Sequence, residues 1–180
     1  MYRRLTRHPA FECPPVRRIE ASASRSEPRR LEVGFRLIGD LSQLTIPAAT
    51  APLRTDELWK HTCFEAFVRP AGGEAYGEFN LAPSSRWAAY RFDGYRAGMA
   101  PAKALSLPVI GAGQGDEVFD LSASLSFDTL PADIAWEVAL SAVIEAKDGS
   151  LSYWALKHDS AEKPDFHAAA GFTFTLAPNG

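Results

Sequence analysis

The stretch LWKHTCFEAFVRPAGGEAYGEFNLAPSSRWAAYR, residues 58–91, carries most of the information about the fold. Apolar and polar residues alternate through three runs of this stretch and its continuation: 58–69, 75–82 and 86–92. Segments rich in proline, glycine and serine, 70–73 and 83–85, separate the runs. A period of two is typical of strands, and such short breaks are typical of hairpin turns. The stretch therefore predicts a three-stranded antiparallel meander.

One face of this meander is predicted to collect aromatic and charged side chains, because successive side chains of a strand point to opposite faces. Phe64, Ala66 and Val68 are predicted to face the core. The other face would then hold Trp59, His61, Glu65, Tyr76, Glu78, Asn80, Trp87 and Arg91. Two interpretations stay open at this point: an ordinary solvated sheet face with cross-strand charge pairs, or a binding site.

The rest of the chain also favours strands over helices. Further strands are predicted at 16–24, 31–38, 102–109, 120–128, 134–145, 151–156 and 172–176. Asp148-Gly149 predicts a type I′ turn, 111–115 a loop, and 93–99 a loop that brings Tyr95 and Arg96 near the polar face. With 180 residues and 46% hydrophobic content, the chain suits one compact core. We expect an all-β, jelly-roll-like antiparallel β-sandwich of about nine strands with little helix.

The N-terminal segment differs in composition from the remainder. Residues 1–15 hold three prolines, and their three arginines outnumber Glu12. We expect a basic arm over residues 1–15, followed by a single domain over 16–180.

Charge and motifs exclude several classes of protein. A net charge of -3 argues against bulk nucleic-acid binding, which depends on phosphate neutralisation. No apolar run approaches the roughly 20 residues of a membrane helix, and the N-terminus lacks the hydrophobic region of a signal peptide. We therefore expect a cytoplasmic protein in which Cys13 and Cys63 are free thiols. No CxxC, GxGxxG, P-loop or CxxCH motif is present.

Three segments carry a resemblance to a known family: LWKHTCFEAFV, YGEFNLAPSSRWAAYRFDGYR and SYWALKHDSAEKPDFH. They resemble the DOMON-like domains related to the family 9 carbohydrate-binding modules, from about Leu31 to Phe174. The resemblance implies a β-sandwich that binds a sugar or, in other branches, haem. It implies no catalysis.

The resemblance also implies individual site residues. Sugar-binding relatives place a tryptophan six positions before a glutamate, and Trp59 and Glu65 have that spacing. A second tryptophan near the C-terminus closes the relatives' site, but 163–167 contains none, so Phe166 or Trp154 is the candidate substitute. The arginine and amide of those relatives correspond to Arg91 or Arg86 and to Asn80. The candidate ligand-binding set is Trp59, His61, Glu65, Glu78, Asn80, Arg86, Trp87, Arg91, Phe166 and His167.

Four functions are compatible with these residues. The preferred one is non-catalytic saccharide binding without a cofactor, with Trp59 and Trp87 stacking on the sugar and Glu65, Asn80 and Arg91 bonding its hydroxyls. The same aromatic and arginine residues would also suit an interface with a protein partner. Haem or metal binding is the third, through Met99, His158 and His167, His61-x-Cys63-x-Glu65 or Asp165-x-His167. A glycosidase using Glu65 and Glu78 is the fourth, although a nearby Arg91 favours ion pairing over proton donation.

Overall fold

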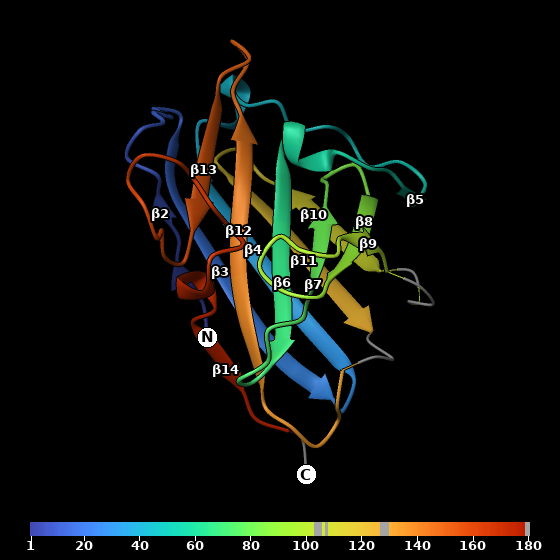
Figure 1. The fold of residues 1–180 in the computed structure, drawn as a ribbon. Coiled ribbons are helices and arrows are strands. Elements are labelled where there is room, and N and C mark those ends of the chain that lie inside the picture. The colour runs from blue at the N-terminus through green and yellow to red at the C-terminus, as the bar shows by residue number, and fades with distance from the viewer. Residues whose placement is uncertain (103–105, 107, 127–129, 179–180) are drawn as a thin grey trace.

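Two β-sheets packed face to face form the molecule (Figure 1). The structure, a computed structural model, describes residues 1–102, 106, 108–126 and 130–178. Almost all pairing is antiparallel, so the predicted all-β sandwich is confirmed.

The smaller sheet has five strands. Their spatial order is β1 (Arg3–Arg4), β3 (Val16–Glu27), β4 (Arg30–Gly39), β11 (Val118–Ser126) and β10 (Val109–Gln114). The strands predicted at 16–24, 31–38 and 120–128 correspond to β3, β4 and β11, with residues 127 and 128 outside the described part. The predicted loop at 111–115 is wrong, since β10 pairs with β11 as far as Gln114.

The larger sheet has nine strands and contains the predicted meander. Its main order is β2 (Thr6–Arg7), β13 (Leu151–Ala155), β12 (Trp136–Glu145), β6 (Cys63–Pro70), β7 (Tyr76–Leu81), β8 (Arg86–Phe92) and β5 (Leu53–Arg54). In addition, β14 (Phe174–Leu176) pairs with β12, and β9 (Ala100–Pro101) pairs with β8. Only β5 joins its neighbour in parallel. The strand predicted at 102–109 falls partly on residues 103–105 and 107, which lie outside the described part.

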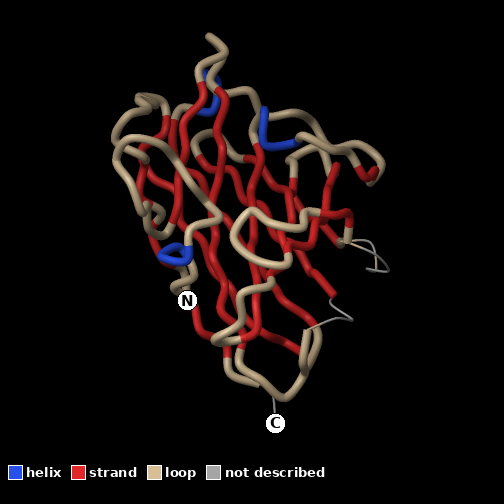
Figure 2. The backbone as a smooth tube through the Cα atoms, viewed as in Figure 1, coloured by secondary structure: helices blue, strands red, loops and turns tan. Residues whose placement is uncertain are grey.

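Helical structure is limited to short 3₁₀ turns in the described residues (Figure 2). These turns are η1 (Leu41–Gln43), η2 (Leu58–Lys60) and η3 (Ala169–Gly171). None of them has the length or hydropathy that crossing a bilayer requires.

Aromatic packing between the sheets forms the main core. Phe64 of β6 lies between two rings of the smaller sheet, with centroid distances of 5.0 Å to Phe35 and 5.9 Å to Phe119. Trp136 is fully buried, and the Arg25 guanidinium lies 3.7 Å from the centre of its ring. The alternation seen in the sequence therefore places one face of each sheet in this core.

The hairpin between β12 and β13 forms where Asp148-Gly149 predicted a turn, but its type is different. Of the pair predicted to be central, Asp148 and Gly149, only Gly149 has a positive φ, 85°, whereas a type I′ turn needs two such residues. The Gly149 amide donates to the Ala146 carbonyl at 2.9 Å, and the Ala146 amide donates to the Ser150 carbonyl at 2.9 Å. The first of these bonds makes Lys147 and Asp148 the central residues of the turn, and the left-handed Gly149 follows them.

The N-terminal segment, predicted as a basic arm, is hydrogen-bonded to both sheets. Strand β1 pairs with β3 of the smaller sheet, and β2 pairs with β13 of the larger sheet. Leu5, between them, is fully buried, and its amide donates to the Ile19 carbonyl at 2.9 Å. The division of the chain at residue 16 stays a prediction.

Replacing Phe64 by alanine should destabilise the protein by about 3–5 kcal/mol, because it removes the ring that joins the two sheets and leaves a cavity. Denaturant unfolding would measure the change. Val109→Ala, at a side chain that is 71% exposed, is the control and should alter stability by less than about 0.5 kcal/mol. Equal effects of the two substitutions would contradict this view of the core.

Candidate functional site

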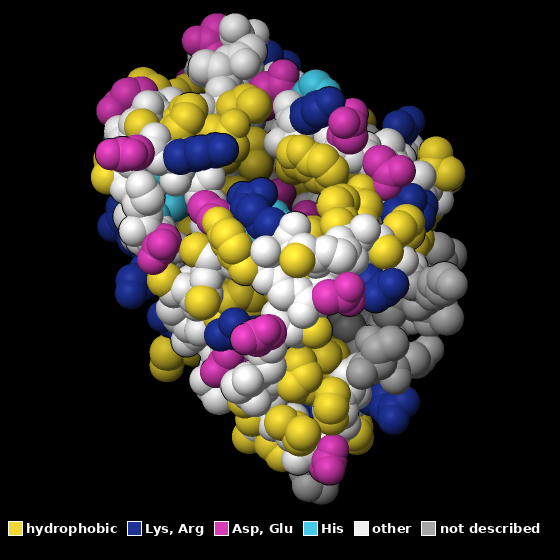
Figure 3. Space-filling model, in the orientation of Figure 1, with side chains coloured by type: hydrophobic (Ala, Val, Ile, Leu, Met, Phe, Trp, Pro, Cys, Tyr) yellow, Lys and Arg dark blue, Asp and Glu magenta, His cyan; other side chains and the backbone are white. Residues whose placement is uncertain are grey.

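A cavity of about 460 Å³ opens on the face of the larger sheet that points away from the main core. Figure 3 shows this hollow, bordered by hydrophobic side chains, with acidic and basic atoms visible within it. Strands β6, β7, β12 and β13 supply Glu65, Glu78, Val143 and Tyr153 to its floor and wall. The cavity is therefore built on the sheet that contains the meander.

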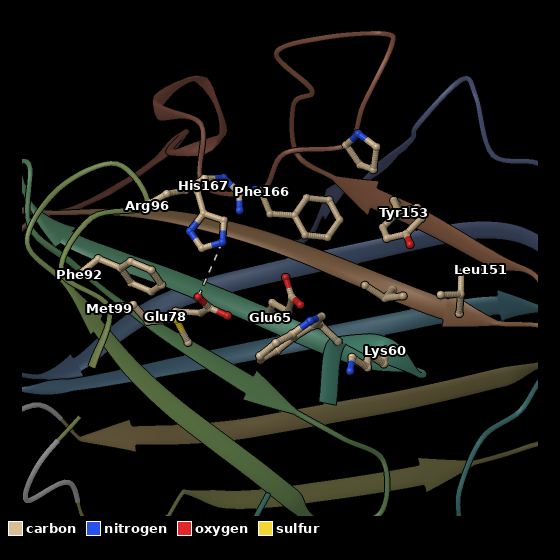
Figure 4. Close-up of a pocket in the computed structure, with 13 residues that line it drawn as sticks. Lys60, Glu65, Glu78, Phe92, Arg96, Met99, Leu151, Tyr153, Phe166 and His167 are labelled. Atoms are coloured by element: carbon tan, nitrogen blue, oxygen red, sulfur yellow. Dashed lines mark ion pairs between the residues drawn. The ribbon is translucent and has the colours of Figure 1, made fainter. Parts of the chain in front are cut away.

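Strand register brings the two acidic residues together. Glu65 pairs with Asn80 across β6 and β7, and Phe67 pairs with Glu78. Paired residues in an antiparallel sheet share a face, and so do residues two positions apart on one strand. The two carboxyl groups consequently occupy diagonal positions on neighbouring strands and point into one cavity (Figure 4).

Two segments far apart in the sequence form the roof. The 93–99 loop contributes Arg96 and Met99, and the 156–168 loop contributes Phe166 and His167. They are tied together at Asp165, whose carboxylate accepts hydrogen bonds from the Arg96 guanidinium at 2.7 Å and from the Tyr95 hydroxyl. The cavity is thus enclosed by a polar clasp, defined here as Tyr95, Arg96 and Asp165.

A chain of hydrogen bonds orients His167 above the floor. The Arg96 amide donates to the Tyr76 hydroxyl at 3.2 Å, and that hydroxyl lies 2.8 Å from His167 Nδ1. Burial, reinforced by the charge of Arg96, lowers the pKa of His167 to about 4, so the ring is neutral at neutral pH. The Tyr76 hydroxyl contacts Nδ1, and the other ring nitrogen, Nε2, lies 3.9 Å from Glu78 Oε2 (Figure 4).

The two carboxyl groups are nearly inaccessible to bulk water, with Glu65 3% and Glu78 6% exposed. Glu65 Oε2 accepts a hydrogen bond from the Ser141 hydroxyl at 3.1 Å, and Glu78 Oε1 accepts one from the Asn80 amide at 2.8 Å. Burial, with the neighbouring Glu78 as the second cause, raises the pKa of Glu65 to about 8. Burial also raises the pKa of Glu78, although the Asn80 hydrogen bond and Arg96 oppose it. Glu65 is therefore mainly protonated at neutral pH and can donate a hydrogen bond.

Five of the predicted site residues meet at this cavity: Trp59, Glu65, Glu78, Phe166 and His167. Trp59 lies on η2 instead of a strand, yet it reaches the same cavity as Glu65. Asn80 is fully buried beneath the floor and acts through its hydrogen bond to Glu78.

Trp87 and Arg91 lie on the opposite face, so their predicted placement is wrong. Leu81 pairs with Trp87, and Trp87 is buried in the main core. Arg91 is exposed and pairs with Asp93 at 3.1 Å. The number of residues in the turn between β7 and β8 decides which side chains of β8 face the cavity, and alternation along β8 alone cannot fix it.

His61, Arg86 and Trp154 also lie away from the cavity. The His61 side chain is 71% exposed, and its Nδ1 lies 2.8 Å from Glu145 Oε2. Arg86 is exposed at the start of β8. Trp154 is buried in the main core, so of the two candidate substitutes for a second tryptophan only Phe166 reaches the site.

Several cavity residues were missed from the sequence. Phe92 was missed because Trp87 and Arg91, on the other face of β8, were predicted at the site, and Tyr153 lies on a strand with two largely apolar faces. Arg96 was placed near the polar face only as part of its loop. The sequence signal for Arg96 was its position beside an aromatic residue, Tyr95, in the loop that follows the last strand of the meander.

The structure also changes two of the alternatives. Arg91 does not approach Glu65 or Glu78, so the ion-pairing argument against a glycosidase loses its basis. Among the described residues, no three His, Cys, Asp or Glu side chains gather as a group able to hold a metal ion. Cys63, in the suggested His61-x-Cys63-x-Glu65 set, is fully buried, whereas the His61 side chain is largely exposed.

Comparison with known proteins gives a likeness of fold. No family model matches the chain, and no curated protein matches it. A crystal structure from Bacteroides uniformis, described as a putative carbohydrate-binding protein, superposes with a TM-score of 0.64 at 14% identity. A family 9 carbohydrate-binding module from Caldicellulosiruptor kristjanssonii, in complex with glucose, superposes with a TM-score of 0.53 at 8% identity. Each alignment covers 98% of this chain and 85% of the other, and at these identities it shows the fold alone.

Glu65→Gln should change how stability depends on pH. The raised pKa of Glu65, about 8 against an ordinary 4.5, means that between these values the unfolded chain has lost a proton that the folded chain keeps. Stability of the wild type therefore falls as pH rises through this window, and glutamine removes this contribution. We expect similar stabilities at pH 5 and a variant more stable by on the order of a few kcal/mol at pH 8.

Unfolding curves at pH 5, 6, 7 and 8 would measure this effect. The control is Glu162→Gln, at an exposed position outside the cavity lining, and it should follow the wild-type pH profile. Parallel profiles for Glu65→Gln and the wild type would show that Glu65 is ordinarily ionised in the folded protein.

Proposed function

We propose that the protein binds a saccharide, without catalysis, in the cavity on the larger sheet. The observation that carries this proposal is that Trp59 and Phe166 line the same cavity as Glu65 and Glu78. Saccharide sites combine flat aromatic surface with a small number of fixed polar groups, because a sugar ring has both an apolar C–H face and equatorial hydroxyls.

The polar groups offer both kinds of hydrogen bond. Protonated Glu65 can donate, the neutral His167 ring can donate or accept through Nε2 according to its tautomer, and the Glu78 carboxylate can accept. Since these groups are held by Ser141, Tyr76 and Asn80 respectively, their orientations are fixed before a ligand arrives. The shared fold with a family 9 carbohydrate-binding module in complex with glucose supports the same class of ligand.

Hydrolysis is a second candidate, favoured by one observation. A buried carboxyl group that keeps its proton at neutral pH, beside a second carboxyl group, is what a general acid in a glycosidase requires. Glu65→Gln and Glu78→Gln would each abolish sugar release by such an enzyme. A protein that only binds sugars releases no sugar from aryl glycosides, whether as the wild type or as either variant.

Tryptophan fluorescence should report binding at Trp59. Of the four tryptophans, Trp59 lines the cavity, whereas Trp87, Trp136 and Trp154 are buried in the main core. Titration with glucose-type sugars at millimolar concentration should therefore perturb the emission. Trp59→Ala should abolish this response and lower the affinity measured by calorimetry by about tenfold or more, because the stacking surface is lost.

Leu53→Ala is the matched control, since Leu53 is an exposed apolar residue outside the cavity lining. It should leave both the fluorescence response and the affinity unchanged. Saccharide binding would be refuted if a panel of neutral, acidic and amino sugars caused no change in tryptophan emission and no measurable heat of binding.

A further inference from the structure

We propose that the saccharide bound here carries a protonated amine, and that Glu65 and Glu78 together receive its ammonium group. This inference rests on the proposed function and narrows it from saccharides in general to amino sugars. It depends on the charges of the cavity floor and its rim and on the aromatic rings of its walls.

The floor contains two acidic groups and no basic one. In the part of the chain that the structure describes, neither Glu65 nor Glu78 forms an ion pair with a lysine or arginine. The partners within hydrogen-bonding distance are the uncharged Ser141 and Asn80. Two buried carboxyl groups without a counter-cation are costly when both are ionised, and a cationic ligand would remove that cost.

Each carboxyl group has one oxygen available to a ligand. Ser141 occupies Glu65 Oε2, and Asn80 occupies Glu78 Oε1. The remaining oxygens, Glu65 Oε1 and Glu78 Oε2, accept no hydrogen bond from the described residues, and both side chains line the cavity. An ammonium group has three N–H donors and so can bond two carboxylates at once, whereas a hydroxyl has one donor.

The basic side chains at the rim are already neutralised from outside the floor. The Arg96 guanidinium pairs with Asp165 at 2.7 Å, and Lys60 Nζ pairs with Glu57 at 2.8 Å. His167, above Glu78, is neutral at neutral pH because burial and Arg96 lower its pKa. The charge of Arg96 still opposes the rise in the pKa of Glu78, so the rim compensates the acidic floor only in part.

The walls are also suited to a cation. Trp59, Phe92, Tyr153 and Phe166 line the cavity around the two acids. Aromatic rings attract cations through their negative faces and also cover the apolar face of a sugar. An amino sugar is the ligand that uses the rings and the acid pair together.

Binding of an ammonium group should release protons. In the empty site, burial raises the pKa of both carboxyl groups, and the neighbouring Glu78 raises that of Glu65 further, so a proton on the acid pair is favoured. A bound cation stabilises the ionised forms, so the proton passes to the buffer. A neutral sugar brings no charge that would cause this release.

Calorimetry of the wild-type protein near pH 7 with glucosamine, glucose and N-acetylglucosamine tests the inference. The three sugars share a ring, but only glucosamine carries a charged amine. We expect glucosamine to bind at least about tenfold more tightly than the other two. Its apparent enthalpy should also differ between two buffers of unequal ionisation enthalpy, which measures the released proton.

Glu65→Gln and Glu78→Gln should each reduce the preference for glucosamine over glucose to nearly one, while Glu162→Gln should keep it. Equal binding of glucosamine and glucose by the wild type would overturn this inference and leave saccharide binding intact. Binding of none of the three sugars, nor of others in the panel above, would overturn the proposed function and this inference with it.

Discussion

The register of β6 against β7, and of β7 against β8, is the constraint on which the site depends. It places Glu65 opposite Asn80 and Phe67 opposite Glu78, so that two acids share one face of the sheet. The reverse face of the same strands carries Phe64, Phe79 and Leu81 into the main core. A slip by one residue would exchange the two faces, burying the carboxyl groups between the sheets and exposing the phenylalanines. Stability of the core and chemistry of the cavity are therefore set by the same hydrogen bonds.

Enclosure by the two roof loops gives the acidic pair its unusual chemistry. Without a roof, Glu65 and Glu78 would lie on a solvated sheet face and titrate as ordinary surface acids. The polar clasp joins loops far apart in sequence, since Arg96 and Asp165 are separated by 69 positions. Once covered, the carboxyl groups are in a medium of low dielectric constant, where each raises the cost of ionising the other. The polar clasp, by holding the roof over Glu65 and Glu78, therefore helps to keep the acid pair protonated.

The sequence predicted most strands, because alternation with a period of two is a local property. It also predicted that Trp59 and Glu65 share a site, and that Phe166 could stand where relatives have a second tryptophan. It failed for Trp87 and Arg91, because the side that a strand presents depends on the length and conformation of the preceding turn. Ser85, in that turn, has a left-handed backbone with φ of 66°, which the pattern of residues does not predict. The approach of Arg96 to Asp165 was equally out of reach, since it depends on how two distant loops fold over the sheet.

The first seven residues have a consequence for how molecules could associate. Strands β1 and β2 occupy corresponding edges of the two sheets, and each is only two residues long. Each pairs with only two residues of its neighbour, so most of the 12-residue β3 extends beyond β1. On the other side of the smaller sheet, β10 presents a rim of six residues. Of the four strands that end the main paths of the two sheets, β10 is the longest, and a long edge strand is where a strand from another molecule adds most readily.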